Sequence, residues 1–95
     1  MSKVDPEVYE KVMQAYGYRC AECFSGDNIE LHHLLPRSRW RVKKYKHFID
    51  SPFNLVPLGG NLGCGCHEKH KSKYKITDRQ AEVYEWWLRE VNNEN

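Results

Sequence analysis

The stretch Leu31-His32-His33-Leu34-Leu35-Pro36 sets two adjacent histidines in a short apolar run that ends at a proline. A run of this kind predicts a short strand, because proline cannot continue the hydrogen bonding of a strand interior. Histidine has an unperturbed pKa of about 6.5, so near neutral pH it serves as a metal ligand or as a base. The pair therefore predicts that one imidazole binds a metal ion while the other accepts a proton. The alternative is a pair of ordinary structural histidines.

The chain has 95 residues, 40% of them hydrophobic, which predicts one small domain whose apolar core needs additional stabilisation. No apolar segment is long enough to span a bilayer. The charged start Met1-Ser2-Lys3-Val4-Asp5 lacks the apolar run of a secretory signal. We therefore expect a soluble cytoplasmic protein without a membrane partner.

Positive charge is concentrated beside the histidines. The formal net charge of +2 does not identify a partner, but no acidic residue occurs from Leu31 through Ile49. Cationic residues in this segment are interleaved with Trp40 and Tyr45, which predicts contact with a polyanion; a solvated loop is the alternative. The cationic residues are Arg37, Arg39, Arg41, Lys43, Lys44 and Lys46.

The four cysteines form two close pairs, Cys20-Ala21-Glu22-Cys23 and Cys64-Gly65-Cys66. Two such pairs brought together predict a structural zinc site, whose thiolate ligands add the stability that a small core lacks. Disulfides do not suit a chain without a secretory signal, and free buried thiols are the remaining alternative. The second pair has one intervening residue where a zinc site usually has two. His70, in Cys66-x-x-x-His70, is therefore open as the fourth ligand in place of Cys64.

An N-terminal helix is predicted from its cap and its apolar spacing. Asp5 suits the N-cap, Pro6 the first helical position, and Gly17 the end. The predicted buried face consists of Val8, Val12, Ala15 and Tyr16.

Two short strands and a short helix are predicted for the middle of the chain, with strands around residues 29–35 and 53–58. The helix is expected from about Cys66 to Lys73, with His67 and His70 on one face. The connection from Arg37 to Asp50 is longer than most, so we expect it to be ordered only partly, or by its ligand.

A last helix is predicted by the capping box Thr77-x-x-Gln80 and an apolar stripe that we expect to pack on the first helix. Together the elements predict an α+β fold in which two helices flank a zinc-stapled hairpin and helix. The apolar stripe consists of Val83, Tyr84, Trp87, Leu88 and Val91.

In this order the segments resemble the HNH nucleases, whose ββα-metal motif holds a histidine on the first strand, an asparagine between, and a histidine on the helix. The resemblance covers Cys20 to about Lys73 and implies a single HNH nuclease domain over residues 1–95, with its motif core at about 20–73. It is similar to the small nucleases of phages and bacteria, which implies the cytoplasm of a bacterial or phage-infected cell. The matching segments are Cys20-x-x-Cys23, Leu31-His32-His33-Leu34-Leu35-Pro36-Arg37-Ser38, Asn54-Leu55-Val56-Pro57-Leu58 and Cys66-His67.

The resemblance also implies a role for each motif residue. His32 and His67 align with the ligands of one catalytic divalent cation, and His33 aligns with the general base. Asn54 aligns with the residue that orients the loop and the base through hydrogen bonds. The resemblance offers His70 as a third ligand or a phosphate contact, but family members with a further histidine usually place it four residues after the helix ligand, and His70 lies three residues after His67.

The implied reaction is metal-assisted hydrolysis of DNA phosphodiesters that leaves 5′-phosphate and 3′-hydroxyl ends, with RNA as an open second substrate. Two imidazole ligands suit Mn²⁺, Ni²⁺, Co²⁺ or Zn²⁺ as well as Mg²⁺. Trp40 either stacks on a base or covers the loop. The residues expected to bind the nucleic-acid backbone without reading bases are Arg37, Arg39, Arg41, Lys43 and Lys44.

Two alternatives from other functional classes follow from the same residues. The first is a zinc-stapled nucleic-acid-binding module without catalysis, as the basic segment and the irregular cysteine spacing suggest. The second is a protein in which all these histidines and cysteines serve metal-dependent structure alone.

Overall fold

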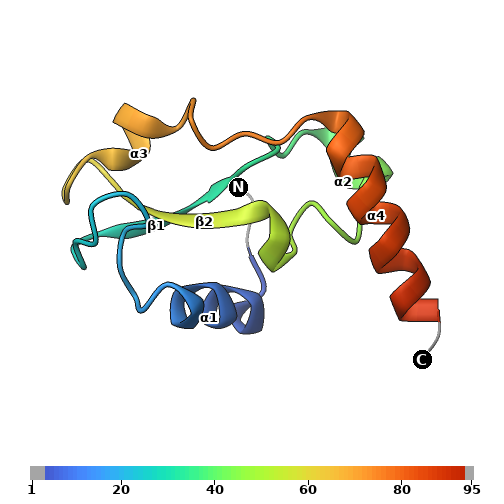
Figure 1. Ribbon diagram of the computed structural model, residues 1–95, viewed down its shortest axis with the longest axis horizontal. Helices are drawn as coiled ribbons and strands as arrows, with labels where there is room; N and C mark the ends of the chain where they lie inside the picture. Colours follow the sequence, from blue (N-terminus) through green and yellow to red (C-terminus); the bar gives the residue numbers. More distant parts are fainter. Residues whose placement is uncertain (1–3, 94–95) are drawn as a thin grey trace.

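A computed structural model describes residues 4–93 of the chain, so the start at residues 1–3, cited above against a secretory signal, lies outside the described residues (Figure 1). Within the described part, helices and a two-stranded antiparallel sheet confirm the α+β class. None of the helices between residues 4 and 93 is both long and apolar enough to cross a bilayer. The elements are α1 (Pro6–Ala15), β1 (Ile29–His33), α2 (Arg39–Lys44), the 3-10 turn η1 (Pro52–Asn54), β2 (Leu55–Gly59), α3 (Cys66–His70) and α4 (Asp78–Asn93).

The hairpin of β1 and β2 is the centre of the fold. Its register pairs Ile29 with Gly59 and His33 with Leu55. Helices α1 and α3 lie on opposite sides of the hairpin, whereas α2 and α4 lie beyond one of its ends (Figure 1). All five residues of β2 are buried. Strand β1 is shorter than predicted, because Leu34 and Leu35 follow it. Strand β2 begins two residues later than predicted, because Pro52 begins a 3-10 turn before it.

Helix α1 begins as predicted and buries a different face. The Asp5 carboxylate accepts a hydrogen bond from the Glu7 amide at 2.8 Å, and Pro6 is the first helical residue. Val12 and Met13 are buried, whereas Ala15 and Tyr16 are exposed. The predicted buried face is therefore wrong at its C-terminal end, where the helix stops at Ala15 and the chain turns through Gly17 at φ 68°.

The segment from Arg37 to Asp50 is ordered by a core of its own, contrary to expectation. It forms α2 and then buries Tyr45, Phe48 and Ile49 at 1%, 0% and 1% exposure. These side chains form one cluster with Leu35, which follows β1, and Ala81 on α4. The basic residues had suggested a loop, but the apolar residues between them supply enough contact to fold it.

Helix α4 carries the predicted capping box, since the Thr77 amide donates to Gln80 Oε1 at 2.9 Å and the Gln80 amide donates to Thr77 Oγ1 at 3.2 Å. The predicted buried stripe is right at Leu88 but wrong at Val83 and Trp87, which are 65% and 46% exposed. The helix instead contributes Ala81 and Leu88 to the cluster around Tyr45, away from α1 (Figure 1).

Glu85 explains why α4 presents this face. Its carboxylate is nearly buried and accepts hydrogen bonds from the His47 and Phe48 amides at 2.8 and 3.0 Å and meets the His47 ring at 2.6 Å. A charged residue is rarely expected at a buried helix position, yet here the backbone satisfies it. His47 thereby receives a structural role.

Replacing Glu85 with alanine is expected to lower the free energy of unfolding by about 2–6 kcal/mol, because the amides of His47 and Phe48 lose their acceptor at about 1–3 kcal/mol each. Urea denaturation followed by circular dichroism measures the change. The matched control is Glu82→Ala on the same helix, which removes only an exposed ion pair with Lys44 and is expected to change stability little. Equal stability of the two variants would contradict this role for Glu85.

Candidate metal centres and active site

The four cysteines meet in one cluster, with their Sγ atoms all within 4.8 Å of one another. Four thiolates about 2.3 Å from a tetrahedral zinc ion lie about 3.8 Å apart, so the cluster fits zinc after a small contraction. Among residues 4–93 it is the one group of three or more cysteines, histidines or carboxylates that is close enough to hold an ion. The prediction of a cysteine metal site is therefore confirmed as a cluster that could bind zinc.

The irregular Cys64-Gly65-Cys66 pair joins this cluster because glycines allow it. Gly65 has φ 73°, a left-handed conformation that glycine adopts without strain, and it turns the chain between the two cysteines. A Cβ at Gly59 would lie 2.2 Å from Cys64 Sγ, so the end of β2 must also lack a side chain. The fourth member is thus Cys64, and His70 does not belong to the group.

Electrostatics at the cluster also suit a cation. Burial alone would raise the pKa of Cys20, but amides of Cys23, Gly59 and Glu22 and the Cys64 side chain together lower it to about 6. Neighbouring Cys64 and burial raise the pKa of Cys66. The cluster therefore favours ionisation of Cys20 and opposes that of Cys66, and a bound cation would favour the thiolate form of both.

His32 and His67, which the family resemblance paired, come together from β1 and α3. His32 Nδ1 lies 3.2 Å from His67 Nε2, and the ring planes meet at 69°. On the other side of each ring, His32 Nε2 lies 3.1 Å from the Tyr74 carbonyl oxygen and His67 Nδ1 lies 2.7 Å from Glu30 Oε1. Both outer partners are acceptors, so each outer nitrogen must donate its proton.

This pattern leaves both inner nitrogens with lone pairs. In a neutral imidazole one nitrogen is a donor and the other an acceptor. Two lone pairs that face each other repel unless a proton or metal ion lies between them. Two nitrogen ligands about 2.1 Å from one ion lie about 3.0–3.4 Å apart at right-angled or tetrahedral geometry, so the observed separation of 3.2 Å fits a shared ion.

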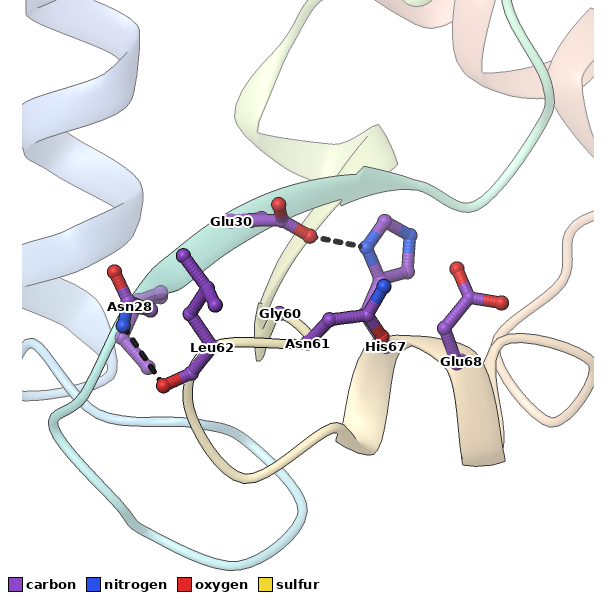
Figure 2. A pocket seen from close by; sticks show the side chains of 8 residues that line it. Asn28, Glu30, Gly60, Asn61, Leu62, His67 and Glu68 are labelled. Carbon is purple, nitrogen blue, oxygen red and sulfur yellow. Dashed lines mark hydrogen bonds and ion pairs between the residues drawn. The ribbon is translucent and has the colours of Figure 1, made fainter.

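Burial lowers the pKa of His32, and the nearby His67 and His33 lower it further against the opposing effect of the Tyr74 carbonyl. The neutral ring that a metal requires is therefore the favoured form. Beside His67 lies an open cavity of about 310 Å³, toward which Glu30, Asn61, Leu62 and Glu68 are grouped (Figure 2). This cavity is lined by His67 and by its outer partner Glu30, and His32 is not among its lining residues, so it gives a ligand access to the outer side of His67.

The side chain of His33 projects from the face of β1 opposite to that of His32, because successive side chains of a strand alternate. It lines a separate cavity with Leu31 and with Val4, Pro6 and Tyr9 at the start of the chain and on α1. Its Nε2 lies 2.9 Å from Asp50 Oδ1, and its side chain is 14% exposed. The structure therefore brings His32 and His67 together but does not place His33 in the cavity beside His67.

Asn54 is fully buried and ties three segments together. Its Oδ1 accepts from the Leu35 amide at 2.8 Å, and its Nδ2 donates to the carbonyls of Leu35 at 3.2 Å and Ile49 at 2.8 Å. These bonds join Leu35, just after β1, to Ile49. The next residue, Asp50, contacts His33. Asn54 thus holds the loop that ends at Asp50, and it makes no direct bond to His33 among the described contacts.

The predicted phosphate-binding cations differ in their surroundings. Arg41 donates from Nε and Nη2 to the two carboxylate oxygens of Asp78, each at 3.0 Å, and so joins α2 to the start of α4. Arg37 and Lys44 also have carboxylate partners. Within residues 4–93 no ion pair involves Arg39 or Lys43, and both are exposed on α2 beside Trp40, which is itself exposed and under the Arg41 guanidinium.

Sequence reasoning missed three residues of this region, although two of them left a signal. Asp50 is the only acidic residue between Glu30 and Glu68, at the end of the basic run. Glu30 lies two residues before His32 and therefore on the same face of β1. The Tyr74 carbonyl left no signal, because any residue could supply it.

Comparisons with known proteins do not identify the chain. No protein-family model matches it, and no curated protein or solved structure shows significant similarity to it. The assignment of function therefore rests on the motif residues and their geometry.

Proposed function

We propose that this chain is a metal-dependent DNA endonuclease or nickase of the HNH type. The observation that carries the proposal is the pair of imidazole nitrogens, His32 Nδ1 and His67 Nε2, that converge at 3.2 Å while Tyr74 and Glu30 bind their outer nitrogens. Metal-binding histidines usually donate the other ring N–H to a carbonyl or carboxylate in this way. An ordinary structural histidine pair would need a shared proton at the same position.

The proposed chemistry divides between the two faces at the end of β1. His33 accepts a proton from a water molecule, whose oxygen forms a bond to phosphorus as the bond to the departing oxygen breaks. A divalent cation on His32 and His67 would neutralise charge on the phosphate and on the departing oxygen. In-line displacement places the attacking and departing oxygens on opposite sides of phosphorus. A base and a ligand pair on opposite faces of one strand end suit that requirement.

Binding of the substrate is proposed to rest on the backbone rather than on the bases. Arg39 and Lys43 lie exposed on α2, and Trp40 between them offers a flat surface. Contacts of this type are salt-sensitive and give little sequence preference.

The test is nicking of supercoiled plasmid by the zinc-loaded protein with Mg²⁺, Mn²⁺, Co²⁺ or Ni²⁺, against a control without added metal and against single-stranded RNA. Conversion to open-circular or linear DNA that requires added metal, with 5′-phosphate ends, is the expected result. Plasmid that stays supercoiled with every metal would contradict the proposal.

A second candidate is a nucleic-acid-binding module without catalysis, stabilised by zinc at the cysteine cluster. The observation in its favour is that His33 lines a different cavity from His67. Salt-dependent binding to DNA together with unchanged plasmid under all metals would select this candidate.

A further inference from the structure

Asp50 and Arg37 lie behind the proposed general base. Asp50 Oδ1 lies 2.9 Å from His33 Nε2, and the same oxygen accepts from Arg37 Nε at 3.1 Å. Asp50 Oδ2 lies 3.2 Å from Arg37 Nε, so one donor spans both carboxylate oxygens. The three side chains come from the end of β1, the residue after Pro36 and the end of the 37–50 segment.

The position of Asp50 is fixed by the fold as well as by Arg37. Asn54, which is fully buried, donates to the carbonyl oxygen of Ile49 at 2.8 Å. Ile49 itself is buried in the cluster with Leu35 and Tyr45. Both the backbone and the side chain of Ile49 are therefore held in place. This restricts how far the carboxylate of the adjacent Asp50 can move from His33.

We propose that Asp50, held by Arg37, is a positioning residue that fixes His33 in the tautomer with its proton on Nε2 and thereby makes Nδ1 the proton-accepting atom. This inference rests on the proposed function and deepens it. A carboxylate oxygen only accepts, so a neutral His33 ring at this distance donates from Nε2 and carries its lone pair on Nδ1. No hydrogen bond to His33 Nδ1 is found among residues 4–93, so this nitrogen is not engaged by the protein in that part of the chain.

In the proposed reaction Nδ1 receives the proton of the attacking water, and the ring then carries both N–H bonds while Asp50 continues to accept from Nε2. Arg37, which the sequence suggested only as a phosphate contact, also holds Asp50. Its Nε is committed to Asp50, whereas its two Nη groups have no acceptor among the described residues and remain suited to a phosphate oxygen. Arg37 therefore joins the backbone of the substrate to the carboxylate behind the base.

Asp50→Asn is the informative substitution, because the amide has the size of the carboxylate but offers an N–H that favours the other tautomer. The expected result is a fall in kcat of about 10²–10⁴-fold, the usual contribution of a general base, with KM changed less than threefold. Asp50→Glu is expected to recover part of kcat. The control is Glu10→Gln, an exposed carboxylate on α1 whose loss is expected to leave both constants unchanged.

A second measurement does not require activity. Two-bond ¹H–¹⁵N correlation spectra of the zinc-loaded protein without a second metal report which ring nitrogen of His33 carries the proton. The wild type is expected to show Nε2–H, and Asp50→Asn is expected to lose this single tautomer while keeping its amide spectrum and melting temperature.

The outcomes separate this inference from the proposed function. Nε2–H in the wild type with no plasmid cleavage would leave the positioning intact and remove the nuclease. Metal-dependent cleavage with an Nδ1–H tautomer, or with kcat unchanged in Asp50→Asn, would overturn the role of Asp50 and leave the nuclease standing. A rise in the KM of Asp50→Asn with kcat unchanged would make Asp50 a substrate contact and would also contradict the inference.

Discussion

Cys20→Ser is expected to abolish zinc retention and to unfold the domain at room temperature. Cys20 is fully buried and belongs to the apolar cluster that also contains Val56 and Leu58 of β2. Zinc binding contributes about 10–16 kcal/mol in small zinc-dependent peptides. Because small domains have a net stability of only about 5–15 kcal/mol, loss of the ion outweighs what remains.

Zinc content by elemental analysis and thermal melting by circular dichroism measure the effect. Chelation of the wild type is expected to have the same result as the substitution, and His70→Ala is the control that keeps zinc and the melting temperature. Acid is also expected to release the ion. Without the ion, the pKa of Cys20 is already lowered from 9.0 to about 6, so its thiolate stabilises the metal-free fold fully above pH 9, and this contribution is lost as the pH falls through about 6. A Cys20→Ser protein with one bound zinc and the wild-type melting temperature would contradict this account of the cluster.

His33→Ala is expected to reduce plasmid nicking by about 10²–10⁴-fold at saturating metal, because the proton of the attacking water loses its acceptor. DNA affinity is expected to stay within threefold, since His33 is a half-buried neighbour of α1 rather than part of the basic surface on α2. The measurement is the initial rate of open-circle formation, together with DNA binding measured without added catalytic metal.

His47→Ala is the matched control for this substitution. It removes another partly buried histidine with a carboxylate partner, but that partner is Glu85 on α4, away from the hairpin. Some loss of stability is expected from it and no loss of kcat while the protein stays folded. Equal rates for His33→Ala and the wild type would show that the water is activated by another group.

Local signals in the sequence were sufficient for the parts of the fold that depend on neighbouring residues. The Asp5 cap and the Thr77–Gln80 capping box depend on short-range chemistry. The hairpin, the cysteine cluster and the histidine pair join residues far apart in the sequence, and they were expected because strand patterns, paired cysteines and the family resemblance signal them.

The parts that could not be predicted depend on partners distant in sequence. Glu85 is polar and therefore did not suggest a buried helix face, yet amides of residues 47 and 48 satisfy it and turn the aromatic side of α4 outward. The burial of Tyr45, Phe48 and Ile49 could not be predicted either, because these residues lie among the charged residues of the basic segment. Tertiary packing overrides local preference in both cases.

Asp50 shows the same limit at the candidate site. The sequence showed a single acid at the end of a basic run, but only the loop held by Asn54 places that acid beside His33. Geometry of this kind is set by the fold and not by spacing.

The most direct test of the shared-ion claim is calorimetric titration of the zinc-loaded protein with Ni²⁺ in the absence of DNA. One further ion is predicted to bind, with affinity lowered by more than about 100-fold in His32→Ala and in His67→Ala, because even the outer partners of such ligands contribute about 10–100-fold. His70→Ala is predicted to bind as the wild type does. No second ion in the wild type, or equal affinity in all variants, would mean that the imidazoles of His32 and His67 do not hold a common cation.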